Sequence, residues 1–259
     1  MPNSFAYLAL FSWPLVALLL FRLMPPLRAM IWTILGGYLF LPVGTGINLP
    51  MLPTFDKELI PSLSAAVLVW FALRREAARE RLIAAREKRR NRSAAGPDAD
   101  RDEAAPAAPP PPSRPNLVAR LSALGVLLVL VLPFAVYLTN REPLVFETRA
   151  MPGMKPYDAF SMALGRSVML LPFLLGWRYL RGPDAPRELL RAFVWGGLIY
   201  SLPILLEVRL SPQLNVWIYG YFPHSFIQFM RDGGYRPLVF LEHALRVGIF
   251  VAMACLAAA

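Results

Sequence analysis

The sequence contains very little cysteine and histidine: one cysteine, Cys255, and two histidines, His224 and His243, among 259 residues. A single thiol excludes an intramolecular disulfide. The two histidines lie far apart along the chain and lack an obvious third ligand, so we expect no metal site. Cys255 lies in an apolar stretch, where we expect a small apolar side chain. No metal ion or other cofactor is therefore predicted.

Motifs that bind nucleotides or activate a nucleophile are also missing. The sequence contains no P-loop, no GxGxxG fingerprint, no GxSxG elbow and no HExxH pair. Their absence argues against a pump that carries its own ATPase and against a zinc protease.

Charge is missing from long stretches of the chain and arrives in bursts between them. Hydrophobic residues make up 56% of the sequence, and about 20 apolar residues in a helix cross a membrane. We therefore predict an all-α polytopic membrane helix bundle with about seven transmembrane helices. No basic residue precedes the first span, which predicts a retained helix rather than a signal peptide. The predicted spans are 5–23, 29–47, 59–73, 117–138, 159–177, 192–206 and 238–258.

The net charge of +10 is concentrated in one loop, because eleven of the 27 Lys and Arg residues lie between Arg74 and Arg114. The positive-inside rule explains such a cluster without a nucleic-acid partner, and we expect none. One set of alternate loops holds 17 basic residues and the other holds seven. The richer set should be cytoplasmic, which places the N-terminus on the outer, periplasmic side.

The long basic loop divides the chain into two membrane parts. Residues 1–74 form a predicted three-span part, and residues 117–259 form a four-span part with an external loop at 207–237. Residues 75–116 connect them. The first half of this connection, to residue 92, is rich in Ala, Glu and Arg, which predicts an extension of the third helix. The Pro- and Ala-rich remainder, 93–115, predicts a disordered linker.

The external loop 207–237 contains two predicted short amphipathic helices. Apolar residues recur with helical spacing over 214–222, and Pro223 ends the pattern. Ser225 is a predicted N-cap for the second helix, which the following Gly-Gly pair would end. Helices this rich in Trp, Tyr and Phe suit the membrane interface.

Ionisable residues surround these helices and suggest a site. Charged groups at membrane depth are costly and usually face a cavity or a partner. Several arginines on one face can hold phosphate or pyrophosphate, and a histidine or carboxylate can act as a general base. We expect one cavity at the outer boundary to gather Arg166, Arg209, Arg231, Arg236, Glu242, His224 and His243.

Ordinary structural roles stay open for each of these residues. Glu242 and Arg246 are spaced i, i+4 and can simply pair with each other. Arg209 can extend to lipid headgroups, and His224 can be a polar loop residue.

Three strings resemble segments of bacterial O-antigen ligase-like or polysaccharide polymerase-like inner-membrane proteins. They are INLPMLPTFDKELIPSLSA, YDAFSMALGRSVMLLPFLLGWRYL and EVRLSPQLNVWIYGYFPHSFIQFMRDGGYRPLVFLEHAL. The resemblance implies a metal-independent glycosyltransferase of lipopolysaccharide or related envelope glycans. Such an enzyme takes a glycan from an undecaprenyl pyrophosphate carrier at the periplasmic face of the inner membrane.

The resemblance also implies roles for residues. Arginines of the external loops would hold the pyrophosphate, and Arg209, Arg231 and Arg236 match this role by type. His224 or His243 would assist the acceptor hydroxyl. Family members have ten or more spans, so the resemblance implies a copy shortened at its C-terminus.

Three functions stay open from the sequence. The first is a transferase or polymerase of lipid-linked glycans, acting with membrane lipid and other proteins of polysaccharide assembly. The second is a transporter or flippase for the same kind of lipid, and the third is a non-catalytic membrane subunit. Transporters usually place polar groups near the bilayer midplane in repeated halves, whereas the ionisable residues here gather at the outer boundary. The transferase is therefore the leading hypothesis.

Overall fold

The computed structural model describes residues 1–49, 52–95, 117–146, 149–231 and 233–259. Over these residues the chain is an all-α membrane helix bundle, as predicted from its charge-free stretches. The helices are α1 (Ser4–Leu23), α2 (Pro26–Phe40), α3 (Leu59–Ala95), α4 (Leu117–Thr139), α5 (Pro156–Tyr179), α6 (Ala185–Leu210), α7 (Leu214–Tyr219) and α8 (Ala244–Ala258), with one 3-10 turn, η2 (Phe226–Phe229).

Helices α1, α4, α5 and α6 are long and apolar enough to cross a membrane. Within α4 only Pro133 is buried, whereas Leu124, Leu128 and Leu132 are 50%, 59% and 60% exposed. Continuous apolar surface of this kind is rare on soluble monomers and fits contact with lipid. Helices α2 and α8 have 15 residues each and rise only ~22 Å, so flanking residues must help them cross. The count of seven spans stays a prediction.

Two predicted span boundaries are wrong. The second span, predicted at 29–47, is helical only to Phe40, because Pro42 cannot continue the hydrogen-bond pattern and Gly44 turns the chain with a φ of +64°. The last span, predicted from 238, becomes helical only at Ala244. Of the six residues before it, Glu242 lines a cavity described below.

Helix α3 continues far beyond its apolar part, as its Ala-, Glu- and Arg-rich composition predicts, and ends at Ala95. The predicted disorder of 93–115 is therefore wrong for 93–95, which are helical. Residues 96–116, with the rest of the predicted linker, lie outside the described residues.

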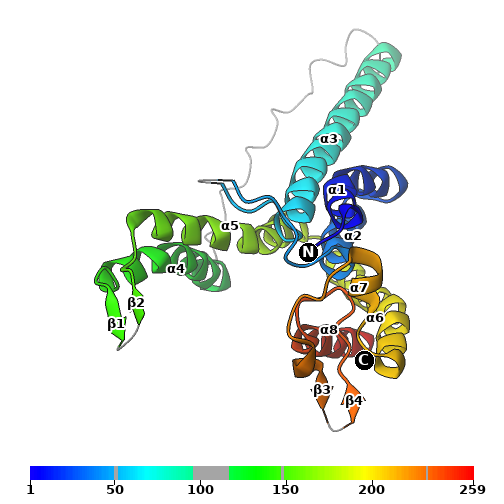
Figure 1. Ribbon diagram of the computed structural model, residues 1–259. Helices are drawn as coiled ribbons and strands as arrows, with labels where there is room; N and C mark the ends of the chain where they lie inside the picture. The colour runs from blue at the N-terminus through cyan, green and yellow to red at the C-terminus, as the bar shows by residue number, and fades with distance from the viewer. Residues whose placement is uncertain (50–51, 96–116, 147–148, 232) are drawn as a thin grey trace.

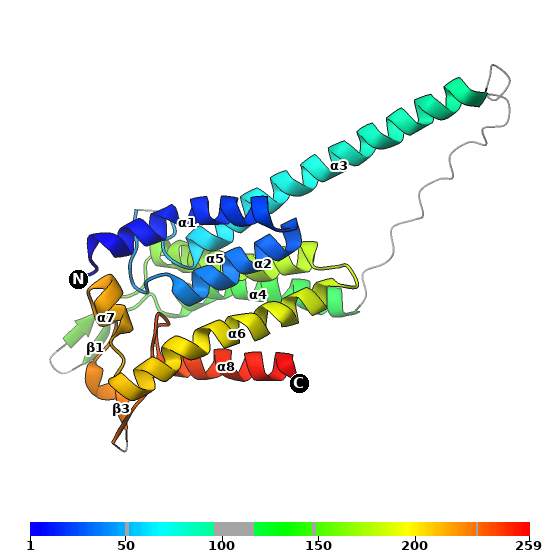
Figure 2. The same cartoon turned by 90° about the vertical axis from the view of Figure 1, so that its right-hand side faces the viewer.

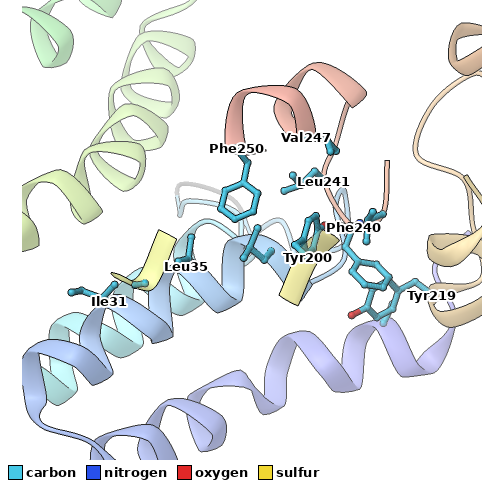
Figure 3. Packing of buried hydrophobic residues seen from close by; sticks show 12 residues of the cluster. Ile31, Leu35, Tyr200, Tyr219, Phe240, Leu241, Val247 and Phe250 are labelled. Carbon is cyan, nitrogen blue, oxygen red and sulfur yellow. Dashed lines mark hydrogen bonds between the residues drawn. The ribbon is translucent and has the colours of Figure 1, made fainter. Parts of the chain in front are cut away.

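The main core lies where α2, α6 and α8 meet (Figure 3). Tyr200 of α6 is fully buried, and its ring makes edge contacts with the rings of Phe40 on α2 and Phe250 on α8. Gly196 lets Leu35 and Phe250 pack close to the α6 backbone. This packing fixes the start of α8 relative to the end of α2.

Helices α4 and α5 form a pair on the periphery. Figure 1 shows them, with the hairpin β1 (Leu144–Phe146) and β2 (Arg149–Met151), extending away from α6, α7 and α8. Leu171 and Leu175 in the second half of α5 pack against α2 and α3. The first half of α5 is thus carried away from the core.

The two ends of the bundle differ. The N-terminus, α7 and the hairpins lie at one end, and the free end of α3 and the C-terminus lie at the other (Figure 2). Loop 41–58 and segment 211–243 also belong to the first end, because they follow α2 and α6 there. We call this the loop end.

The predicted amphipathic helices of the loop end are shorter than expected. Helix α7 ends at Tyr219, because Gly220 adopts a left-handed conformation with a φ of +83°. The second predicted helix is only the 3-10 turn η2, and Ser225 makes no side-chain capping bond there. A hairpin of β3 (Met230–Arg231) and β4 (Gly234–Tyr235) replaces the rest of it.

Candidate functional site

A charged cavity lies at the loop end, between loop 41–58 and segment 238–246. Its volume is about 440 Å³. The charged residues that line it are Asp56, Lys57, Glu58, Glu242 and Arg246. The first three precede α3 and the other two flank the start of α8, so distant parts of the chain build one site.

A buried carboxylate holds in place the segment that leads into one side of this charged cavity. Glu207, in the last turn of α6, is 1% exposed. Its Oε2 accepts hydrogen bonds from the backbone N–H groups of Leu238 and Val239, each at 2.7 Å. Its Oε1 accepts the N–H of Leu214 at 3.0 Å. Glu207 thus fastens both ends of the external segment to α6.

The next residue of this segment, Phe240, is held by a tyrosine. The Tyr200 hydroxyl accepts the N–H of Phe240 at 3.1 Å. Between the two anchors, Val239 has a φ of +54°, which is a strained value for a β-branched residue. The hydrogen bonds on either side maintain this conformation and aim the Phe240 carbonyl at loop 41–58.

Lys57 lies on the opposite wall and is nearly buried, with 9% of it exposed. Its Nζ donates a hydrogen bond to the Phe240 carbonyl at 2.9 Å and lies 5.6 Å from the centre of the Tyr38 ring. Burial, and after it the charge of Arg246, lowers the pKa of Lys57 to about 7. Lys57 therefore changes charge near neutral pH.

Arg246 joins the two sides of the charged cavity. Its Nη2 lies 2.6 Å from Glu242 Oε2, so the predicted i, i+4 pairing is present, and its Nη1 lies 3.9 Å from Glu58 Oε1.

Burial raises the pKa of the Glu58 carboxyl, and the neighbouring Asp56 carboxylate raises it further. Asp56 caps α3 by accepting the backbone N–H of Glu58 and of Leu59.

Aromatic residues of the external segment hold loop 41–58. Tyr219 donates a hydrogen bond from its hydroxyl to the Phe40 carbonyl at 2.6 Å, and the Tyr221 hydroxyl donates to the Val43 carbonyl. Thr45 adds a contact with the Tyr221 hydroxyl at 3.2 Å. The aromatic residues that predicted an interfacial helix therefore also position the charged cavity.

An apolar groove adjoins the charged cavity. It has a volume of about 400 Å³ and runs between α2, α5, α6 and α8. Ile34, Phe193 and Met253 are among its lining residues, and Arg246 is its one charged lining residue in the described part of the chain. Arg246 lines both spaces, so the charged cavity and the apolar groove share this residue.

The structure brings together the two predicted histidines. The ring centres of His224 and His243 are 5.9 Å apart at an interplanar angle of 77°. His243 precedes α8, and its Nδ1 accepts the N–H of Leu245 at 3.1 Å. The neutral His243 ring therefore carries its proton on Nε2. Glu242, directly before His243, lines the charged cavity.

The predicted arginines are not gathered in the same way. Arg166, Arg209 and Arg236 are exposed, do not line the charged cavity, and pair with no carboxylate in the described part of the chain. Arg166 lies on the first half of α5, which leans away from α8 (Figure 1). Arg231 lies in β3, and its side chain is outside the described residues. Among the predicted site residues whose side chains the structure describes, only Glu242 lines the charged cavity.

Sequence reasoning missed the three residues that precede α3. Asp56, Lys57 and Glu58 stand together in a Pro-rich external loop that is otherwise uncharged. This run of ionisable residues was the available signal. The run does not identify its partners, because these lie at and just before the start of α8, far away in the sequence. The Lys57–Phe240 contact spans 183 positions.

Known proteins offer no assignment for this site. A scan against protein-family models matched none, and searches of curated proteins and of solved structures found no match. Among the described residues, no group of three His, Cys, Asp or Glu side chains is arranged to hold a metal ion. The chemistry must therefore be argued from the charged cavity and the apolar groove.

Proposed function

We propose that the protein is a membrane enzyme of envelope polysaccharide assembly, which transfers a glycan from an undecaprenyl pyrophosphate carrier. One observation carries the proposal: Arg246 lines both the charged cavity and the apolar groove. A ligand with an anionic head and a long hydrocarbon tail can occupy both spaces, with its charge at the guanidinium group. A polyprenyl pyrophosphate has this combination of charge and apolar length.

The proposed step uses a carboxylate as the base. An acceptor hydroxyl attacks the sugar carbon that is bonded to the pyrophosphate, and Glu58 takes the hydroxyl proton. The new glycosidic bond forms as the bond to the carrier breaks, which releases undecaprenyl pyrophosphate. The raised pKa makes Glu58 a stronger base than an ordinary carboxylate. The Arg246 guanidinium offsets the charge of the leaving group.

We expect Glu58→Gln to lower the transfer rate by roughly 100- to 10,000-fold, the usual contribution of general-base catalysis. Binding of the carrier should be kept, because Arg246 remains. Arg246→Gln should instead weaken carrier binding by roughly tenfold, since the guanidinium is partly exposed to solvent. The measurement is release of undecaprenyl pyrophosphate by the full chain in nanodiscs that contain a lipid-linked oligosaccharide and an acceptor glycan.

Glu142→Gln is the matched control, because Glu142 is an exposed carboxylate at the loop end and lies outside both spaces. It should leave rate and binding unchanged. A wild-type protein that binds the carrier without releasing it would indicate a non-catalytic subunit. A wild-type protein that does not bind the carrier contradicts the proposal.

The proposal also assigns the location: a bacterial inner (plasma) membrane, seven spans, and the loop end in the periplasm with the N-terminus. Its support is the excess of basic residues in the loops at the other end. We expect a membrane-impermeant maleimide to label Val145→Cys in intact spheroplasts and to label Leu82→Cys only after lysis. Both side chains are well exposed, and both variants need Cys255→Ala, because Cys255 is exposed.

Reversed labelling of these two positions contradicts the orientation. Labelling of both from outside contradicts the placement of α3 and β1 on opposite sides. Gly153 is unsuitable for this test, although it lies in the same external loop, because an added Cβ would lie 1.9 Å from the Arg141 carbonyl oxygen.

A further inference from the structure

A second polar cavity lies at the end of the bundle opposite the loop end. It has a volume of about 480 Å³ and lies between the first turns of α2 and the first half of α6. Its charged lining residues are Arg28, Glu188 and Arg191, and two tryptophans, Trp32 and Trp195, lie beyond them. The proposed transfer reaction uses none of these residues.

Two arginines share one carboxylate in this second cavity. Arg28 Nε and Nη2 donate to the two oxygens of Glu188 at 2.8 and 2.9 Å, and Arg191 Nη1 donates to Glu188 Oε1 at 3.2 Å. The bidentate bridge ties α2 to α6. The three side chains together carry one net positive charge, and each guanidinium keeps N–H groups that the carboxylate does not use.

The lining of the second cavity changes from charged to apolar along one face of α6. Glu188, Arg191, Trp195 and Ile199 follow one another at helical spacing and span ~16 Å of the helix. Trp195 is 60% exposed, and Ile199 is exposed beyond it. On α2, Trp32 lies one turn after Arg28 and repeats the same order.

This order, from charged to apolar, matches a membrane lipid whose headgroup lies at the end of the bundle opposite the loop end. Arginines suit a phosphate group, because the guanidinium N–H groups match its oxygens. Tryptophan rings favour the level of the glycerol and ester groups, and an exposed isoleucine suits an acyl chain. A headgroup with one negative charge would neutralise the net charge of the second cavity.

We propose that the second cavity is a binding site for an anionic phospholipid, whose phosphate meets Arg28 and Arg191 and whose chains lie against Trp195 and Ile199. The site differs from the proposed substrate site in its position and in its ligand, so either can fail without the other. Basic pockets between transmembrane helices are a general means of holding anionic headgroups.

The test is lipid retention by the full chain. Protein purified from mixed vesicles of phosphatidylglycerol and phosphatidylcholine is expected to retain phosphatidylglycerol selectively in native mass spectrometry. Arg191→Gln should reduce that selectivity about fivefold, the effect of one basic residue near an anionic surface. Trp195→Ala should lower retention of both lipids while keeping the preference for phosphatidylglycerol.

Arg181→Gln is the matched control, because Arg181 is exposed at the same end and does not line the second cavity. Its selectivity should equal that of the wild type. Equal retention of the two lipids by the wild type, or equal loss of selectivity in both arginine variants, overturns the proposal. Displacement of the lipid by millimolar inorganic phosphate also overturns it, because the site would then bind phosphate alone.

Discussion

Replacing Glu207 by alanine is expected to destabilise the protein by about 3–5 kcal/mol, a large effect for one side chain. The carboxylate is buried and accepts three backbone hydrogen bonds, from Leu214, Leu238 and Val239. Removing it leaves the two buried N–H groups of Leu238 and Val239, and the partly buried N–H of Leu214, without an acceptor. The two buried groups lose their partner without regaining water. The strained Val239 would also lose the contact that holds it.

Glu207→Gln separates the role of the charge from that of shape. The amide keeps one oxygen acceptor, but its NH₂ group faces N–H donors and cannot accept from them. We expect the free energy of unfolding of Glu207→Gln to lie between that of the wild type and that of Glu207→Ala. Unfolding by titration with a denaturing detergent measures all three free energies. The control Glu142→Ala removes an exposed carboxylate and should change stability by less than about 0.5 kcal/mol. Equal, small losses for both alanine variants would contradict an anchoring role for Glu207.

The second large effect expected is a dependence of stability on pH that comes from Lys57. Burial lowers the pKa of this residue in the folded protein from 10.5 to about 7. Between these values the unfolded chain binds the Lys57 proton and the folded chain does not. Stability should therefore rise with pH across the range from about 7 to about 10.5, by up to about 1.4 kcal/mol for each pH unit.

Lys57→Met removes this dependence while filling similar space. The variant should be more stable than the wild type below pH 7, where the folded wild type must bury a charge. The difference should shrink as pH rises towards 10. Detergent unfolding of both proteins at pH 6, 8 and 9.5 measures it. Lys155→Met, at an exposed position before α5, should keep the wild-type slope. Parallel pH profiles for the wild type and Lys57→Met would show that Lys57 stays charged in a hydrated site.

The fold class could be predicted from the sequence, because the requirement that produces it is local. A helix in lipid must satisfy its own backbone hydrogen bonds and carry about 20 apolar residues. Each such helix can therefore be recognised from its own stretch of sequence. The long extension of α3 follows from local composition in the same way. Local patterns failed at the ends of elements, as where α2 stops at Phe40 and where α8 starts only at Ala244.

The candidate site was predicted only in part. Residue types, and their expected place at the outer boundary, predicted a site among the ionisable groups near the end of the chain. One of these groups, Glu242, does line the charged cavity. Arg166 and Arg209 were predicted for the same boundary, but neither of them lines the charged cavity. Which groups meet depends on how helices pack, and α5 leans away from α8 (Figure 1).

The sequence by itself determined an all-α membrane bundle, the helical character of the basic extension, and the uneven charge of its two ends. These follow from interactions between residues a few positions apart and from the cost of placing charge in lipid. Only the tertiary structure decided that Lys57 and Glu58 face Glu242 and Arg246, and that Glu207 fastens the segment between them. Such contacts depend on the packing of α2, α6 and α8 around Tyr200, because no local pattern specifies which distant loops a packed core will bring together.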